Sequence, residues 1–242
     1  MTSPTSPTSP TSPSSPAITI HPPGSAHASL RDAQDGADGF DRAWFMGTWN
    51  VAWSTLPMWK DKKNVNIEYV SLTDEPRPTK FESTVSYIKQ SQPDTASPST
   101  GELIAAQRTT KDASRTIVRR VRGTDEAVRG VETLTPGTNG ATFDWRGRNW
   151  LFFVHSHWEV LGYGDDQAGL EWAVTFFSKT LFTPAGIDIY VRPSRQSGTT
   201  DIVTPPQDAR KELVGRIAAA LHGATEEVAQ LASGGFEVPV SP

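Results

Sequence analysis

Three side chains with acid–base and metal-binding chemistry alternate along one short stretch of the sequence. His155, His157 and Glu159 are separated by single residues in the run HSHWEV. Because alternate residues of a β-strand share a face, the three would project together while Trp158 faces the other way. Two imidazoles and a carboxylate on one face suit proton transfer or metal binding. The pattern makes His157 and Glu159 the candidate catalytic residues.

The alternation does not determine which face of this strand lines an interior. With the polar face inward, His157 and Glu159 would orient or activate a molecule in a mostly apolar pocket. With the polar face outward they would be solvated, and Trp158 would line the pocket instead. A metal would need a further ligand, and the remaining histidines lie near the N-terminus or on a late helical segment. We therefore predict no metal and no other cofactor.

These residues belong to a segment, 150–192, that the sequence predicts to be a β-meander. Its three runs are rich in aromatic and β-branched residues and read WLFFVHSHWEVLGYG, LEWAVTFFSKTLF and TPAGIDIYVR. Gly, Asp and Pro turn signals separate the runs, and the gaps are too short for crossover helices. Neighbouring runs should therefore pair antiparallel, with a cross-strand ion pair between Lys179 and Asp188. The protein is expected to be all-β.

Further runs supply the remaining strands of a barrel. Apolar and polar residues alternate most clearly at 64–70 and 81–90. Weaker candidates lie at 103–109, 116–122 and 128–134, and the turn signal at 138–140 precedes another strand at 141–147. With a strand through Trp49 and Trp53, the candidates are enough for a closed antiparallel barrel that holds a ligand.

The segment FDRAWFMGTWNVAWST opens the barrel region. A helical turn at 44–46 precedes Gly47, which permits a tight turn into the strand that carries Trp49. This Gly-x-Trp arrangement resembles the start of the lipocalins and the wider calycin superfamily. The resemblance implies that Arg192, at the end of the last predicted strand, stacks across Trp49 at the closed end of the barrel.

Three longer strings extend the resemblance to roughly residues 40–195. LPMWKDKKNV, SHWEVLGYG and KTLFTPAGIDIY are similar to segments of fungal proteins described as lipocalin-like. The chain departs from typical lipocalins because it lacks their Thr-Asp-Tyr turn, a disulfide and a secretion signal. The resemblance therefore implies an outlying, intracellular calycin-like β-barrel, and the ligands of other members do not transfer to it.

The two ends of the chain differ from the barrel. Residues 1–38 begin with a TSP repeat and are predicted to form a disordered tail. Near the other end, Leu213, Ile217 and Leu221 show helical spacing before the stop signal Gly223, and a short second helix is expected at 225–232. We divide the chain into a tail (1–38), a barrel (39–200), and a C-terminal α-helix packed outside the barrel with a loose end (201–242).

Composition excludes several classes of function. The formal net charge is −4, which gives no reason to expect nucleic acid as a partner. The sequence has no cysteine, and no apolar run reaches the roughly 18 residues of a membrane span. It also lacks a Gly-x-Ser-x-Gly nucleophile motif and a glycine-rich phosphate loop. We expect a soluble cytoplasmic protein, and no pattern indicates its oligomeric state.

Two functions fit these observations, and a third is weaker. The first is a carrier of a hydrophobic small molecule, in which the loop around Trp59 is either a lid over the cavity or is pinned to the outer wall. The candidate wall and lid residues are Trp53, Trp59, Tyr69, Trp158 and Phe176. The alternative is a cofactor-independent isomerase or cyclase that uses His157 and Glu159 as acid and base. The third is haem binding through a histidine ligand.

Overall fold

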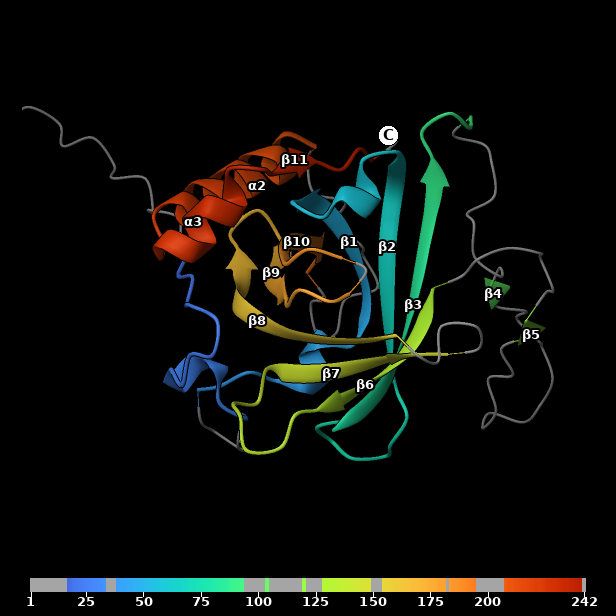
Figure 1. Cartoon of the computed structure of the whole chain (residues 1–242), viewed down its shortest axis with the longest axis vertical. Helices are drawn as coiled ribbons and strands as arrows, with labels where there is room; N and C mark the ends of the chain where they lie inside the picture. Colours follow the sequence, from blue (N-terminus) through green and yellow to red (C-terminus); the bar gives the residue numbers. More distant parts are fainter. Residues whose placement is uncertain are drawn as a thin grey trace, which may run out of the picture.

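The computed structural model describes residues 17–33, 38–93, 103–104, 119–120, 128–148, 154–181, 183–194 and 207–240. Its centre is an antiparallel barrel of eight strands (Figure 1). Consecutive barrel strands pair with each other, and β10 also pairs with β1 and closes the ring. The strands are β1 (Gly47–Ser54), β2 (Lys62–Ser71), β3 (Lys80–Lys89), β6 (Arg129–Leu134), β7 (Thr142–Gly147), β8 (His155–Asp166), β9 (Leu170–Phe177) and β10 (Gly186–Pro193). The predicted antiparallel barrel is confirmed.

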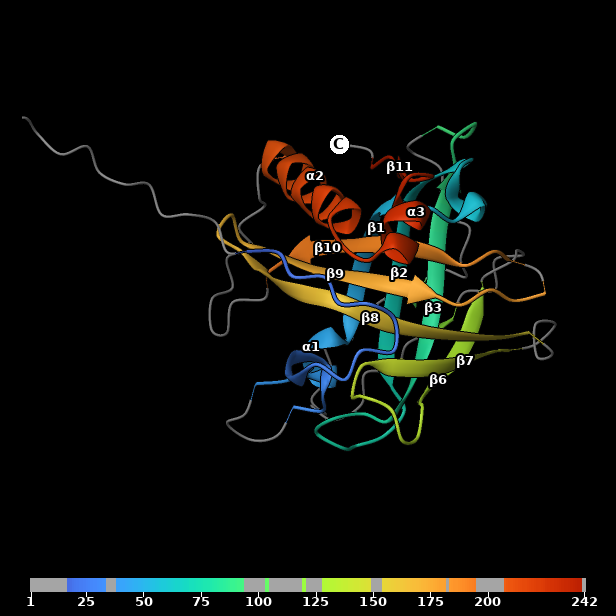
Figure 2. The same ribbon diagram turned by 60° about the vertical axis from the view of Figure 1, so that its left-hand side comes forward.

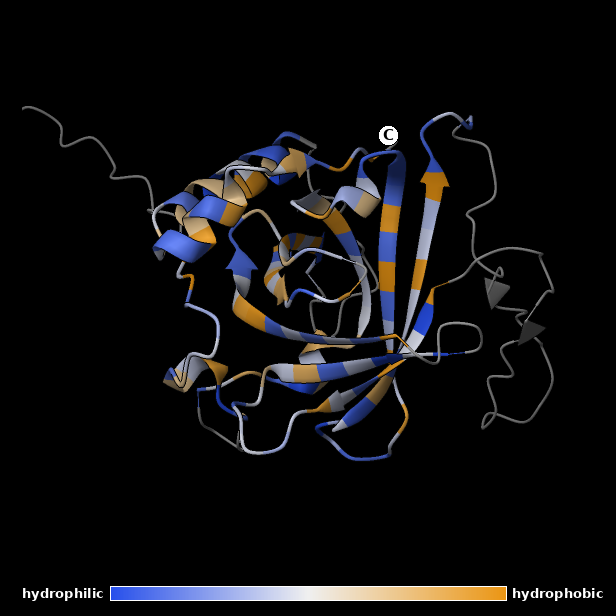
Figure 3. Ribbon diagram, in the orientation of Figure 1, coloured by the Kyte–Doolittle hydropathy of each residue, from blue (hydrophilic) through white to orange (hydrophobic). Residues whose placement is uncertain are grey.

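Strict alternation of residue types fixes the register of β2 and β3. On β2, the side chains of Val65, Ile67 and Tyr69 are buried inside the barrel, and the residues between them are partly exposed. On β3, the buried positions likewise recur at every second residue from Phe81. Figure 3 shows these strands as alternating hydrophobic and hydrophilic bands. A slip of one residue would turn the apolar set of either strand into solvent.

Strands β9 and β10 are buried on both faces because helices cover their outer side. The helices are α2 (Gln207–His222) and α3 (Glu226–Ala232), which lie over β10 (Figure 2). Ile187 and Ile189 of β10 share an outer apolar cluster with Leu213 and Ile217 of α2. The predicted C-terminal helices and their place outside the barrel are therefore found in the structure.

The segment that follows α3 completes the barrel wall. Strand β11 (Phe236–Glu237) pairs with β1, and the backbone N–H of Asn64 on β2 donates to Pro239 O at 2.8 Å. It lies where β1 separates from β2, because the β1–β2 ladder ends at Asn50. The prediction of a loose end after the helices was therefore wrong for residues 236–240.

Residues 17–33 lie on the barrel, contrary to the tail that the sequence predicts for them. His21 N donates to Leu161 O of β8 at 2.8 Å, and Leu30, in the 3₁₀-helix η1 (Ala28–Leu30), is fully buried. The prediction rested on the average composition of the first 38 residues and gave no weight to the apolar side chains of Ile18, Ile20 and Leu30. The rest of that predicted tail, residues 1–16 and 34–37, lies outside the described residues.

The weakest strand predictions fall mainly outside the described part of the chain. Of the runs at 103–109 and 116–122, only β4 (Leu103–Ile104) and β5 (Arg119–Arg120) are described, and they pair with each other. Residues 150–153, at the start of the predicted meander, and the predicted boundary near residue 200 also lie outside the described part of the chain. Among the described residues, no helix is both long and apolar enough to cross a membrane.

Candidate functional site in the barrel interior

A tryptophan and an arginine seal one end of the barrel. The short helix α1 (Arg42–Phe45) leads into Gly47, whose φ of 96° starts β1 in a conformation that glycine adopts without strain. The Arg192 guanidinium lies 3.7 Å from the centre of the Trp49 ring, and its Nε donates to Glu171 at 2.5 Å. The indole N–H of Trp49 donates to the carbonyl of Phe45 at 2.7 Å. This is the contact that the resemblance implied for the closed end.

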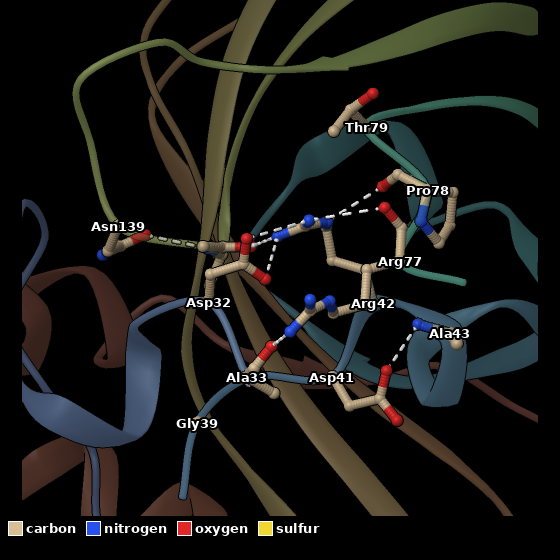
Figure 4. A network of polar contacts seen from close by, with 12 residues as sticks. Asp32, Ala33, Gly39, Asp41, Arg42, Ala43, Arg77, Pro78, Thr79 and Asn139 are labelled. Atoms are coloured by element: carbon tan, nitrogen blue, oxygen red, sulfur yellow. Dashed lines mark hydrogen bonds and ion pairs between the residues drawn. The ribbon is translucent and has the colours of Figure 1, made fainter. Parts of the chain in front are cut away.

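A second buried arginine ties the N-terminal segment to the same end. Figure 4 shows Arg42 between Asp32 and the carbonyls of the β2–β3 connection. Its two terminal nitrogens donate to Asp32 at 2.8 and 3.1 Å, and its Nε donates to Pro78 O at 2.9 Å. A bidentate ion pair of this kind fixes orientation as well as distance. The closed end is therefore held by two arginine–carboxylate pairs.

Above this floor, aromatic rings fill the lower part of the interior. Phe143 and Trp158 have ring centres 4.7 Å apart, and Phe81 lies 5.1 Å from Phe143. Tyr69 stacks on Trp158 at 6.0 Å, and Phe45 lies 5.0 Å from Tyr69. We call these five residues the aromatic column. Such ring contacts add to the burial of apolar surface and make this part of the barrel a packed core.

Smaller side chains face inward toward the opposite, open end. We call this region the upper interior, and its inward residues come from β1, β2, β3, β6, β9 and β10. They include Val51, Ser54, Val65, Val85, Gly130, Thr175 and Asp188, and the larger rings of Trp59, Tyr87 and Trp145 also lie there. The barrel therefore changes from stacked rings below to a mixture of small, polar and aromatic side chains above.

Glu132 of β6 lies at the top of the aromatic column. Its carboxylate accepts a hydrogen bond from the indole N–H of Trp158 at 2.7 Å and another from Ser83. Ser83 in turn accepts from the indole N–H of Trp145 at 3.1 Å. Burial raises the pKa of Glu132 to about 7, because removal from water disfavours the charged form.

Asp188 of β10 is held in the same way on the opposite wall, four strands away around the ring. Ser54 Oγ donates to its carboxylate at 2.5 Å, and the indole N–H of Trp59 donates at 3.3 Å. Burial raises the pKa of Asp188 to about 7. The predicted ion pair with Lys179 is absent, because β9 ends before Lys179 and Thr175 lies opposite Asp188.

Two tyrosine hydroxyls lie between these acids. The hydroxyls of Tyr69 and Tyr190 are 3.4 Å apart, and both side chains are buried. Burial raises the pKa of each phenol, and the negative charges of Glu132 and Asp188 contribute to both shifts. Both phenols therefore stay protonated at neutral pH and can act as hydrogen-bond donors inside the barrel.

The connection from β1 to β2 covers the open end. It contains the 3₁₀-helix η2 (Pro57–Trp59), and the side chains of Leu56 and Trp59 belong to the buried interior cluster. Met58 between them remains 38 % exposed. Trp59 points into the barrel, where it donates to Asp188, so the loop has the lid arrangement and is not pinned to the outer wall.

A hollow of about 640 Å³ opens beside this end of the barrel. Trp145, Ser156 and Leu181 are among the residues that line it. Trp145 connects the hollow to the interior, because the same indole donates to Ser83 next to Glu132. Only the indole ring of Trp145 would separate a small molecule in the hollow from the buried carboxylate of Glu132.

The structure separates the five predicted wall and lid residues into two groups. Trp59, Tyr69 and Trp158 face the interior. Trp53 and Phe176 lie in the outer cluster beneath the helices and cannot line the barrel. A bulge between Val51 and Trp53 interrupts the alternation of β1. On β9, which is buried on both faces, Phe176 shares the outer face with Leu170, Trp172 and Val174, opposite Glu171 and Thr175.

The predicted catalytic residues lie on the outer face of β8. His157 Nδ1 is 2.9 Å from Asp144 Oδ1, and both side chains are exposed. The carboxylate of Glu159 is covered by the N-terminal segment and accepts from Gly24 N at 2.8 Å, and burial raises its pKa. The polar-outward alternative therefore holds, and neither residue can act on a molecule inside the barrel. Within the described ranges, no cluster of three or more His, Asp or Glu side chains has the arrangement of a metal site.

Sequence comparison and structural comparison give different results. No protein-family model and no curated protein sequence matches the chain. Among solved structures, lobster apocrustacyanin A1 aligns with 93 % of this chain and 92 % of its own, at 10 % identity and a TM-score of 0.45. Insecticyanin from the tobacco hornworm Manduca sexta aligns with 93 % of this chain and 90 % of its own, at 14 % identity and a TM-score of 0.44. The siderocalin Ex-FABP aligns with 81 % of this chain and 94 % of its own, at 11 % identity and a TM-score of 0.38. The description of the fold as an antiparallel barrel with a helix packed outside rests on the strand pairing and on the packing of α2.

Proposed function

We propose that this protein binds a hydrophobic small molecule in the upper interior of its barrel, beneath the lid formed by residues 56–59. The observation that carries the proposal is the contrast along the barrel axis. Stacked rings fill the lower part, whereas the upper part combines small side chains and a few convergent polar groups with the rings of Trp59, Tyr87 and Trp145. Mostly apolar walls with few, well-placed hydrogen-bonding groups are typical of small-molecule sites.

The lid provides a way in, and the floor closes the other end. Trp59 is held by a hydrogen bond to Asp188 that is 3.3 Å long, at the upper end of the usual range. Lifting the loop would uncover Asp188 and Ser54 together. The closed end, by contrast, is sealed by Arg192 and Trp49, so we propose that the ligand enters and leaves past the lid.

The placement of His157 and Glu159 leaves no geometric basis for an isomerase or cyclase that acts inside the barrel, because both residues line a hollow on the outer face of β8. An acid and a base must lie within hydrogen-bond reach of the atoms they act on. Both residues are separated from the interior by the wall of β8. Ligation of haem inside the barrel by His155 or His157 fails for the same reason. We propose a binding protein that works in the cytoplasm, where its cysteine-free sequence needs no disulfide.

Two tryptophan substitutions on one strand test the proposal. Val65 faces the upper interior and is fully buried, whereas Val70 on the same strand faces solvent and is 50 % exposed. The probe is N-phenyl-1-naphthylamine, a neutral fluorophore that brightens in apolar sites. We expect Val65→Trp to weaken its binding by at least about tenfold and the matched control Val70→Trp to leave it within about twofold.

Circular dichroism and melting of both variants check that the barrel still forms. If the folded Val65→Trp protein binds the probe as tightly as the unmodified protein does, the ligand site is not in the upper interior. If the unmodified protein binds neither this probe nor any compound retained from its own source in native mass spectrometry, the proposed function is wrong.

A further inference from the structure

The two acids of the barrel interior lack a cationic partner. The carboxylates of Glu132 and Asp188 accept hydrogen bonds from serine hydroxyls and tryptophan indoles, all of which are neutral. Within the described part of the chain, neither acid forms an ion pair with Lys or Arg. Buried carboxylates are ordinarily paired with a cation or held neutral, because an isolated charge away from water is costly.

A second polar group in the same place has an unused bonding capacity. Thr175 is fully buried on β9, directly opposite Asp188 in the strand register. Its hydroxyl lies within hydrogen-bonding reach of the Tyr190 phenol. A hydroxyl oxygen has two lone pairs, so Thr175 can also accept a hydrogen bond from a donor placed beside Asp188.

The charge of the site selects among ligand chemistries. An anionic ligand would be repelled by two carboxylates, and a neutral alcohol would leave their charge uncompensated. A protonated amine supplies both a positive charge and several N–H donors, which suit a carboxylate and a hydroxyl oxygen. The surrounding rings of Trp59, Tyr69 and Trp158 favour a cation with an apolar body.

We propose that the ligand is a hydrophobic amine whose ammonium group donates to Asp188 and Thr175, with Glu132 facing it from the opposite wall. This inference rests on the proposed binding function and specifies its ligand class. The apolar body of the amine lies along the upper interior, above the aromatic column. Trp59 of the lid then covers the ammonium group and the carboxylate that it neutralises.

The groups around the acids make this selectivity depend on pH. The groups that face Asp188 are Ser54 of β1, Thr175 of β9, Trp59 of the lid and the phenols of Tyr69 and Tyr190. The groups that face Glu132 are Ser83 of β3, Trp145 of β7, Trp158 of β8 and the same two phenols. No other group in this set titrates below the range of a phenol. The pKa values of both acids are about 7, so a cation gains its partners as the pH rises through that value.

A matched pair of ligands tests the proposal on the unmodified protein. 2-(2-Naphthyl)ethylamine and 2-(2-naphthyl)ethanol share one apolar body and differ in charge. Calorimetric titration at about pH 8 should show the amine binding at least about tenfold more tightly than the alcohol. At about pH 5, where both acids are protonated, the preference should fall to about twofold or less. Equal binding of the two at the higher pH, or a preference that does not change with pH, would overturn the inference.

Substitutions locate the effect. Asp188→Asn should remove the amine preference, and Thr175→Val should reduce the preference by a smaller factor. An amine preference that survives in folded Asp188→Asn protein refutes the assignment. If neither naphthyl compound binds while N-phenyl-1-naphthylamine still binds in a Val65-dependent way, the amine inference is wrong and the proposed function stands. If no probe binds, both are wrong.

Discussion

The carboxylates at the closed end and those in the upper interior have different partners. At the closed end, Arg42 pairs with Asp32 and Arg192 pairs with Glu171. In the upper interior, Glu132 and Asp188 have only neutral donors. Both regions belong to one barrel of the same strands, so the difference lies in the side chains and not in the fold. The arginine–carboxylate pairs fix the geometry of the closed end. The two acids of the upper interior have no cation beside them among the described residues and can therefore bind a cationic ligand.

The largest expected effect comes from removing charge compensation at the closed end. Arg192→Ala leaves Glu171 buried without its cation and removes the ring contact to Trp49. We expect a loss of about 3–5 kcal/mol in the free energy of unfolding, measured by urea denaturation. Arg148→Ala is the matched control, because Arg148 pairs with Glu82 at the surface and is 45 % exposed, so its loss should cost about 0–1 kcal/mol. Similar losses in both variants would contradict the role of the closed end.

The upper interior should respond in the opposite sense when its charge is removed. The pKa of Glu132 is about 7 in the folded chain, above its ordinary value of 4.5, so the unfolded chain ionises first as the pH rises. Stability is therefore expected to fall between about pH 4.5 and about pH 7, by up to about 3 kcal/mol for this group, and to level off above that range.

The substitution Glu132→Gln tests that prediction, because glutamine keeps an oxygen for the Trp158 indole and carries no charge. Urea denaturation at about pH 5 and about pH 8 should show a smaller loss of stability in the variant than in the unmodified protein. The same slope with pH in both proteins would mean that Glu132 is not the group that titrates.

A smaller effect is expected at the seam where β11 completes the wall of the open end. A Cβ atom on Gly235 would lie 1.7 Å from the Trp53 ring, so Gly235→Ala should cost about 1–3 kcal/mol through overpacking. Gly215 in α2 has open space around it, and Gly215→Ala should stabilise the protein by about 0.5–1 kcal/mol. Thermal unfolding of the two variants measures both, and destabilisation by the helix substitution would argue against this packing.

The parts of the fold that sequence could predict are those with one apolar face. Strand β2 alternates cleanly, so its inward residues were identifiable before the structure. The outer placement of Trp53 was not, because a bulge breaks the period of β1 and no local signal in NVAWST marks it. For Phe176 a signal existed, because it shares the more apolar face of β9 with Leu170, Trp172 and Val174, whereas the other face carries Glu171 and Thr175. The strand alone did not show that the helices cover the more apolar face.

The candidate site was predictable only in part. Trp59, Tyr69 and Trp158 were identified as aromatic residues able to line a cavity. Glu132 was missed, because an acid in a strand is ordinarily assigned to the solvated face. For Asp188 a signal existed, since it alternates with isoleucines and shares a face with Tyr190 in GIDIY. The sequence did not show which residue lies opposite Asp188 on the neighbouring strand. The register of β9 and β10 shows that this residue is Thr175.

Closure of the barrel depends on residues far apart in the chain. The pairing partners of β1 come late in the chain: Val51 pairs with Tyr190 of β10, and Trp53 pairs with Glu237 of β11. During synthesis from the N-terminus, the edge of β1 that pairs with β10 must therefore stay unpaired until about 140 further residues have been made, and the end that pairs with β11 until about 180. An unpaired strand edge is a template for wrong pairing with other chains, and distant pairings form slowly. The newly made chain is thus most prone to aggregate just before its two ends meet.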